Sequence, residues 1–69
     1  MAILKINGKA MDFADSLPKN LAELLEYLKV NDATVVAEID SKIISRSNFA
    51  DTALADGQQI ELIKLVGGG

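Results

Sequence analysis

Few side chains in this sequence could take part in chemistry. It contains neither cysteine nor histidine, so it offers no thiolate nucleophile and no imidazole that titrates near neutral pH. Ser41, Ser45 and Ser47 have no histidine to activate them. The acidic candidates for metal binding or acid–base work are Asp12, Asp15, Asp32, Asp40, Asp51 and Asp56. Nearly all lie beside predicted turns, where aspartate bonds to the backbone, and they lack the ligand spacing of a metal site. We therefore expect a protein that is not an enzyme and that binds no metal or cofactor of its own.

The end of the sequence is the remaining candidate for chemistry. A strand-like run over residues 59–66 leads directly into Gly67-Gly68-Gly69, where no side chain hinders access to the α-carboxylate. Glycine lets a backbone approach another surface closely, and three extended residues reach about 10 Å. We predict that Gly67 and Gly68 thread into partner active sites and that the Gly69 carboxylate is the reactive group. The tail should be mobile, because it has no apolar side chain to bury.

Length and charge restrict the possible partners. The 69 residues predict one domain over residues 1–66, followed by a flexible tail over residues 67–69. The net charge is −3 and the seven basic residues form no run, which argues against nucleic-acid binding. No apolar run approaches the roughly 20 residues of a membrane span, and no signal peptide is recognisable. We expect a cytoplasmic protein that is monomeric alone.

The turn and periodicity signals predict an α+β fold. The predicted elements are strands over residues 2–6, 9–13, 34–39, 42–45 and 58–65, a helix over residues 20–29 and a short 3₁₀ turn around Phe49. Asn7-Gly8 favours a type I′ hairpin turn. About fifty residues separate the first strand from the last, enough for the crossover that parallel pairing requires. This order indicates a β-grasp (ubiquitin-like) fold, with a mixed sheet packed on one main helix.

The same periodicities predict a core and an open face. Asn20 should cap the helix, with Glu23 reaching back to the cap's N–H. The expected core joins a helical stripe to the inner face of the sheet: Leu21, Leu24, Leu25 and Leu28 against Leu4, Ile6, Val35, Ile39, Ile60 and Leu62.

Strand alternation places Ile63 and Leu65 on the outer face of the sheet, together with Ile3 of the neighbouring first strand. We predict that this apolar patch docks a partner, with Arg46 at its rim. Scattered surface hydrophobes are the alternative interpretation.

Several segments resemble the ThiS sulfur-carrier family of thiamine biosynthesis, within the ubiquitin-like ThiS/MoaD group. The resemblance covers essentially the whole chain. It is carried by Asn7-Gly8, by Leu21-Ala22-Glu23-Leu24-Leu25, by Ile43-Ile44-Ser45-Arg46-Ser47-Asn48-Phe49 and by the end from Ala50 to Val66-Gly67-Gly68-Gly69. The sequence departs from the family pattern at Ser45 (usually Pro), Phe49 (usually Trp), Asp40-Ser41 and Gln58. None of these departures touches the tail.

The resemblance implies a mechanism and a set of partners. A ThiF-type adenylyltransferase, using ATP and Mg, would convert the Gly69 carboxylate into an acyl-adenylate. Sulfur from a cysteine desulfurase would then replace AMP and leave a thiocarboxylate. A ThiG-type thiazole synthase would accept that sulfur for the thiazole ring of thiamine. Two alternatives stay open: the small sulfur-carrier subunit of molybdopterin synthase, and a ubiquitin-like protein modifier.

Overall fold

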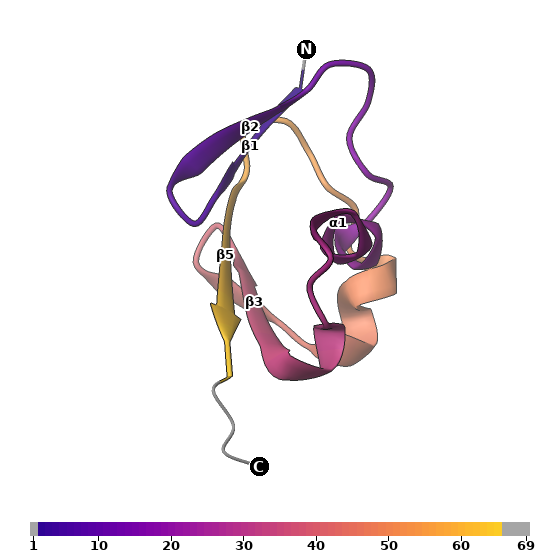
Figure 1. The fold of residues 1–69 in the computed structure, drawn as a ribbon, viewed down its shortest axis with the longest axis vertical. Coiled ribbons are helices and arrows are strands. Elements are labelled where there is room, and N and C mark those ends of the chain that lie inside the picture. Colours follow the sequence, from indigo (N-terminus) through magenta and orange to yellow (C-terminus); the bar gives the residue numbers. More distant parts are fainter. Residues whose placement is uncertain (1, 66–69) are drawn as a thin grey trace.

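The computed structural model describes residues 2–65, which form a five-stranded mixed sheet with one main helix on one side (Figure 1). In chain order the elements are β1 (Ala2–Ile6), β2 (Lys9–Phe13), α1 (Leu21–Leu28), the 3₁₀ turn η1 (Asp32–Thr34), β3 (Val35–Ile39), β4 (Lys42–Ile44), the 3₁₀ turn η2 (Arg46–Asp51) and β5 (Gln59–Lys64). The strand order across the sheet is β2-β1-β5-β3-β4. β5 therefore lies at the centre. It is parallel to β1, as predicted, and antiparallel to β3.

Two hairpin turns form where the sequence tolerates positive φ, and the first of them is the predicted turn at Asn7-Gly8. Asn7 and Gly8 have φ angles of 51° and 83°, the left-handed backbone that a type I′ turn requires. Asp40 and Ser41 join β3 to β4 with φ angles of 49° and 73°. The strands and the helix begin and end within one residue of the predicted bounds. The 3₁₀ turn η1 (Asp32–Thr34), between α1 and β3, was not predicted.

Helix α1 begins and ends with identifiable caps. The Asn20 side chain accepts a hydrogen bond of 2.8 Å from the backbone N–H of Glu23, as predicted. The predicted donor of the return bond in the capping box is wrong. The Glu23 carboxylate accepts from the N–H of Lys19 at 3.2 Å, one residue before the cap. At the other end Lys29 adopts the left-handed conformation, with φ 59°, and its N–H donates to Glu26. The N–H of Val30 donates to Leu25, which completes a Schellman motif.

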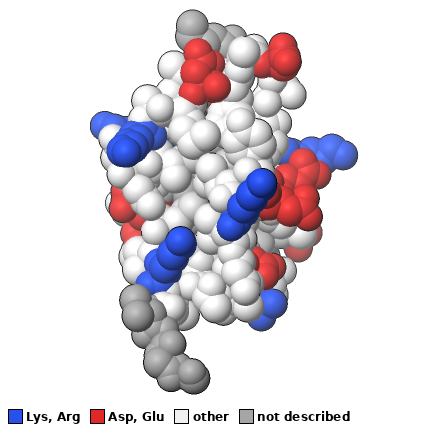
Figure 2. All heavy atoms as spheres, viewed as in Figure 1, with Lys and Arg blue, Asp and Glu red and all other residues white. Residues whose placement is uncertain are grey.

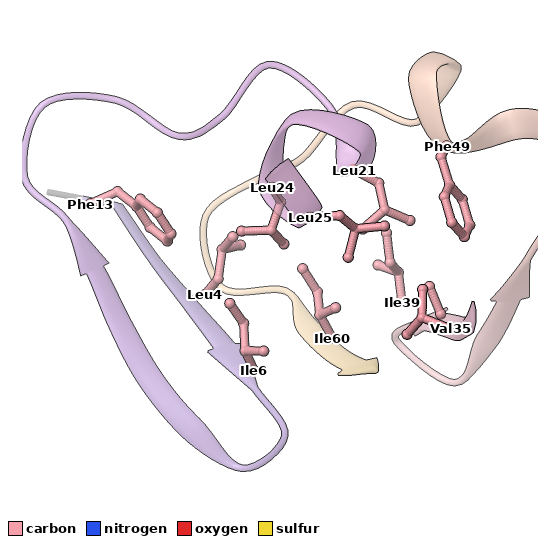
Figure 3. Packing of buried hydrophobic residues seen from close by; sticks show 11 residues of the cluster. Leu4, Ile6, Phe13, Leu21, Leu24, Leu25, Val35, Ile39, Phe49 and Ile60 are labelled. Carbon is pink, nitrogen blue, oxygen red and sulfur yellow. The ribbon is translucent and has the colours of Figure 1, made fainter. Parts of the chain in front are cut away.

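The core lies between α1 and the inner face of the sheet, as Figure 3 shows. Its buried members are Leu4, Ile6, Phe13, Leu21, Leu24, Leu25, Val35, Ala37, Ile39, Phe49 and Ile60. Leu28 and Leu62, expected in the same set, are only partly buried at its margin. Phe49 enters the core from η2, which lies on the same side of the sheet as α1 (Figure 1). Among residues 2–65, no helix has the length and apolar character needed to cross a membrane.

Candidate functional site

The end of β5 is the structural feature closest in sequence to the predicted reactive group. Lys64 pairs with Val35, and the N–H of Leu65 donates to the carbonyl oxygen of Thr34 at 2.8 Å. β5 is the central strand, and the described chain up to Leu65 is hydrogen-bonded on the β3 side of that strand. The predicted roles of Gly67, Gly68 and Gly69 lie outside the described residues.

Asn7 holds β5 on the side opposite β3. Backbone pairing between β1 and β5 covers only Lys5 with Gln59 and Ile6 with Ile60. Asn7 is the first residue after β1, and its side-chain amide bonds to the backbone of Leu62. It accepts from the Leu62 N–H at 2.7 Å and donates to the Leu62 carbonyl at 3.3 Å. The ladder on that side of β5 is therefore extended by a side chain, close to the point where the tail begins.

The outer face of the sheet carries exposed apolar side chains, but not in the predicted grouping. Ile3, Ile63 and Leu65 are 37%, 49% and 55% exposed. The β1–β5 register places Ile3 beside Gly57, whose N–H donates to the Ile3 carbonyl at 2.7 Å. Ile63 lies six residues further along β5, a separation of about 20 Å. Ile63 and Leu65 therefore lie at the tail end of the sheet, and Ile3 lies at the opposite end.

The register supplies Ile63 with one apolar neighbour that was not predicted, and a second exposed apolar residue lies two strands away on the same face. Val36 pairs directly with Ile63 across the β3–β5 ladder, and the next outward residue on β3, Glu38, pairs with Ile43 of β4. Ile43 is 70% exposed. We call Val36, Ile43, Ile63 and Leu65 the outer apolar patch. The sequence signal for Val36 was present, since assigning Val35 to the core directs the next residue of the strand outward.

Two acidic side chains lie within the same face. Glu38 of β3 pairs directly with Glu61 of β5, so both carboxylates point outward from adjacent strands. Glu38 is half-buried and Glu61 is exposed. Two like charges directly opposite each other in a ladder destabilise the sheet. Fold stability therefore does not account for this pair.

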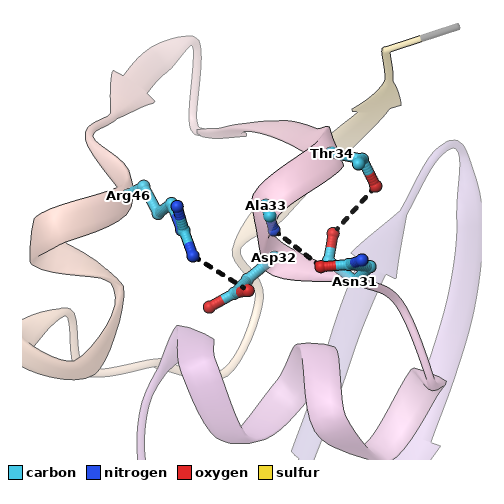
Figure 4. A network of polar contacts seen from close by, with 5 residues as sticks. All are labelled: Asn31, Asp32, Ala33, Thr34 and Arg46. Carbon is cyan, nitrogen blue, oxygen red and sulfur yellow. Dashed lines mark hydrogen bonds and ion pairs between the residues drawn. The ribbon is translucent and has the colours of Figure 1, made fainter. Parts of the chain in front are cut away.

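Arg46, predicted at the rim of the docking surface, is paired on the helix side of the molecule. Its guanidinium lies 3.7 Å from the Asp32 carboxylate, and both side chains are more than half exposed. Figure 4 shows this contact beside the turn in which Asn31 accepts from the N–H of Ala33 and from the hydroxyl of Thr34. Since Thr34 also bonds Leu65, Arg46 lies near the end of the sheet where the tail begins, but not within the outer apolar patch.

Two of the aspartates have structural partners across the sheet. Asp56 accepts a hydrogen bond of 2.7 Å from the N–H of Ile3, and Asp40 accepts one of 3.0 Å from the N–H of Gln59. Both therefore fasten loops to neighbouring strands, in line with the backbone-bonding role predicted for aspartate at turns. No cluster of three or more metal-ligating side chains occurs among residues 2–65.

Two other surface features lie apart from the tail. A shallow hollow of about 480 Å³ is lined by Phe13, Ser16, Leu17, Pro18, Glu23, Glu26 and Tyr27. Phe13 pairs with Ala2 near the start of the chain, so this hollow lies at the end of the sheet away from Leu65. On the face drawn in Figure 2, Lys and Arg side chains lie apart from one another and form no continuous basic surface.

The fold is that of the β-grasp class, because its first and last strands run parallel at the centre of a mixed sheet that packs on one helix. The chain belongs to the ThiS family, whose sequence model matches residues 4–69. This confirms the resemblance drawn from the sequence. Members of this family are small sulfur carriers of thiamine biosynthesis, and the chain is accordingly a carrier and not a catalyst.

One solved structure and two curated relatives are similar to nearly the whole chain. The crystal structure of a thiamine biosynthesis protein (ThiS) from Geobacter metallireducens superposes with a TM-score of 0.82 at 34% identity, covering 97% of this chain and 99% of that one. An uncharacterized protein, ycf40, of Pyropia yezoensis is 36% identical over 96% of this chain and 90% of its own length. A thiazole synthase of Paramagnetospirillum magneticum is 33% identical over 96% of this chain, which spans only 20% of that protein.

Proposed function

We propose that this protein carries sulfur as a thiocarboxylate on Gly69 and donates it to the thiazole ring of thiamine. The Gly69 carboxylate attacks the α-phosphorus of ATP, held with Mg²⁺ by a ThiF-type adenylyltransferase, and pyrophosphate leaves. A persulfide supplied by a cysteine desulfurase then forms a C–S bond at the carbonyl carbon, and AMP leaves with the electron pair of the broken C–O bond. A thiol then attacks the desulfurase sulfur of the resulting acyl disulfide and forms a new S–S bond there, and the thiocarboxylate leaves with the electron pair of the broken S–S bond.

The central position of β5 is the observation that carries this proposal. Pairing with β3 and the bond to Thr34 hold one side of the strand up to Leu65. The Asn7 side chain holds the other side at Leu62. Four further residues follow Leu65 in the sequence, and when extended they reach at most about 14 Å. A rigid domain would therefore present the Gly69 carboxylate at a defined distance from the surface that a partner grips.

The thiazole synthase of Paramagnetospirillum magneticum supports the choice of acceptor. A fifth of that protein is similar to nearly all of this chain, so a ThiS-like segment and a thiazole synthase occur there in one polypeptide. We infer that this chain serves a separate ThiG-type thiazole synthase in the same way.

Intact-protein mass spectrometry tests the proposal. The full chain is incubated with a ThiF-type adenylyltransferase, Mg-ATP, a cysteine desulfurase, cysteine and dithiothreitol. The wild type should gain the mass difference between sulfur and oxygen, and adding a ThiG-type synthase with its substrates should reverse the gain. Deletion of Gly69 should abolish the gain, because it withdraws the carboxylate by about 3.5 Å, and a misplacement of about 1 Å can cost a hundredfold in rate.

The unfolding midpoint of the deletion variant serves as the control and should match that of the wild type. Equal sulfur gain in the deletion variant would contradict the Gly69 assignment. An isopeptide bond to a protein lysine would indicate the modifier alternative. Sulfur transfer to the large subunit of a molybdopterin synthase, but not to a thiazole synthase, would indicate the other carrier.

A further inference from the structure

The facing carboxylates of Glu38 and Glu61 lie at the centre of the outer sheet face. Residues paired directly across antiparallel strands have Cβ atoms about 5 Å apart. Glu61 is followed on the outer face of β5 by Ile63, and Glu38 is preceded on β3 by Val36. The acidic pair therefore adjoins the outer apolar patch, and Ile43 flanks it on β4.

No basic side chain of the described residues neutralises this pair. The ion pair between Arg46 and Asp32 is the one salt bridge found in residues 2–65. On the same face of β1, Lys5 lies opposite Gln59, two positions short of Glu61, and makes no salt bridge to it. The half-burial of Glu38 and the repulsion between the two carboxylates are thus left uncompensated within the described structure.

We propose that Glu38 and Glu61 receive a cationic side chain of the adenylating partner, which docks on the outer apolar patch. This inference rests on the proposed function and adds the chemistry of the docking surface. The apolar residues supply buried area, and the acidic pair supplies charge complementarity that sets orientation and association rate. A single Arg can bridge both carboxylates, because its guanidinium presents donors in a planar fork.

The adenylating protein is the partner with the strongest electrostatic need for such a contact. It must bring a carrier of net charge −3 and the Gly69 carboxylate up to the phosphates of ATP. Cationic groups around its docking surface offset that repulsion and steer the carrier into place.

The test is a charge-neutralising double variant, E38Q/E61Q, measured with a purified ThiF-type adenylyltransferase. Binding is measured by titration calorimetry without ATP, and turnover is measured as ATP-dependent pyrophosphate release. We expect the Kd and the KM for the carrier to rise about tenfold, with kcat unchanged. The Kd of the wild type should increase with NaCl more steeply than that of the variant. The Tm of the variant should rise or stay the same, because a repulsion has been removed.

The variant D15N/E26Q is the matched control, since it removes the same charge from the loop before α1 and from the exposed face of α1. Its Kd should equal that of the wild type. An unchanged Kd for E38Q/E61Q would overturn the inference, and so would an equal rise for D15N/E26Q, which would show a net-charge effect. A loss confined to sulfur transfer to a ThiG-type synthase would also overturn it.

A different result would contradict the proposed function: wild-type protein that binds the adenylyltransferase but forms no thiocarboxylate.

Discussion

The side-chain amide of Asn7 pairs with the backbone of Leu62 as a neighbouring strand residue would. It accepts from the Leu62 N–H at 2.7 Å and donates to the Leu62 carbonyl at 3.3 Å, across 55 positions of sequence. The same residue begins the β1–β2 turn with a φ of 51°. Asn7 thus closes the first hairpin and also fixes the central strand shortly before the tail.

Replacement of Asn7 by glycine should destabilise the protein by about 1 kcal/mol. Glycine retains the positive φ of the turn, so the change isolates the two bonds to Leu62, whose surroundings are exposed. Urea unfolding measures the free energy, and amide hydrogen exchange at Leu62 should accelerate. The variant Asn7→Asp keeps the acceptor and loses the donor, and should fall between Asn7→Gly and the wild type. Wild-type stability for Asn7→Gly would show that the amide contributes nothing.

Truncation of Leu25 to alanine should cost about 2–5 kcal/mol. Its side chain is 1% exposed and belongs to the core cluster, where it lies between Leu24 and Leu21 in the view of Figure 3. The loss of contacts and the cavity left behind both contribute to that cost. Leu65→Ala is the control, because the same atoms are removed from a side chain that is 55% exposed, and it should cost below about 0.5 kcal/mol. Similar unfolding free energies for the two variants would contradict the packing of α1 on the sheet.

A glycine at position 29 should stabilise the protein by about 1 kcal/mol. Lys29 ends α1 in the left-handed conformation, with φ 59°, which is unfavourable for a residue that has a Cβ. Thermal and urea unfolding of Lys29→Gly measure the gain. Lys29→Ala removes the same charge while keeping the Cβ, so it should show no comparable gain. Equal stability of the two variants would mean that the strain is absent.

Ile63, which belongs to the outer apolar patch, should contribute to partner affinity, and Ile3, which lies outside it, should not. Replacing Ile63 by serine removes an exposed apolar anchor beside Val36, and it should weaken binding to a ThiF-type adenylyltransferase about tenfold. Ile3→Ser makes the same change on the same face, about 20 Å away, and should leave the affinity unchanged. Calorimetric titration measures both, and the far-ultraviolet circular dichroism spectrum checks the fold. Equal weakening by both variants would show a docking surface that extends across the whole sheet.

Local signals in the sequence were sufficient for the strands, the helix and most of the core, but not for the buried positions of Phe13 and Phe49. Asn7-Gly8 and Asp40-Ser41 adopt positive φ because of their residue types, and the spacing of Leu21, Leu24 and Leu25 places them on one side of a helix. Alternation along the strands also assigned Ile3, Ile63 and Leu65 to the outer face. These features depend on residues close together in the chain, so the sequence alone was enough to predict them.

Positions along paired strands were decided by the tertiary structure. Alternation assigns a residue to a face but not to a place along its neighbour, and the β1–β5 register joins segments more than fifty residues apart. That register separated Ile3 from Ile63, and the β3–β5 register placed Val36 beside Ile63 and Glu38 opposite Glu61. The bonds from Asn7 to Leu62 and from Lys19 to Glu23 were likewise beyond sequence patterns, because each depends on where a side chain lies relative to one backbone group. The sequence by itself determined the faces of the strands and most of the core. Packing of the inner face against α1 selected the registers and brought Phe13 and Phe49 into the core, and the registers determine which outward residues meet.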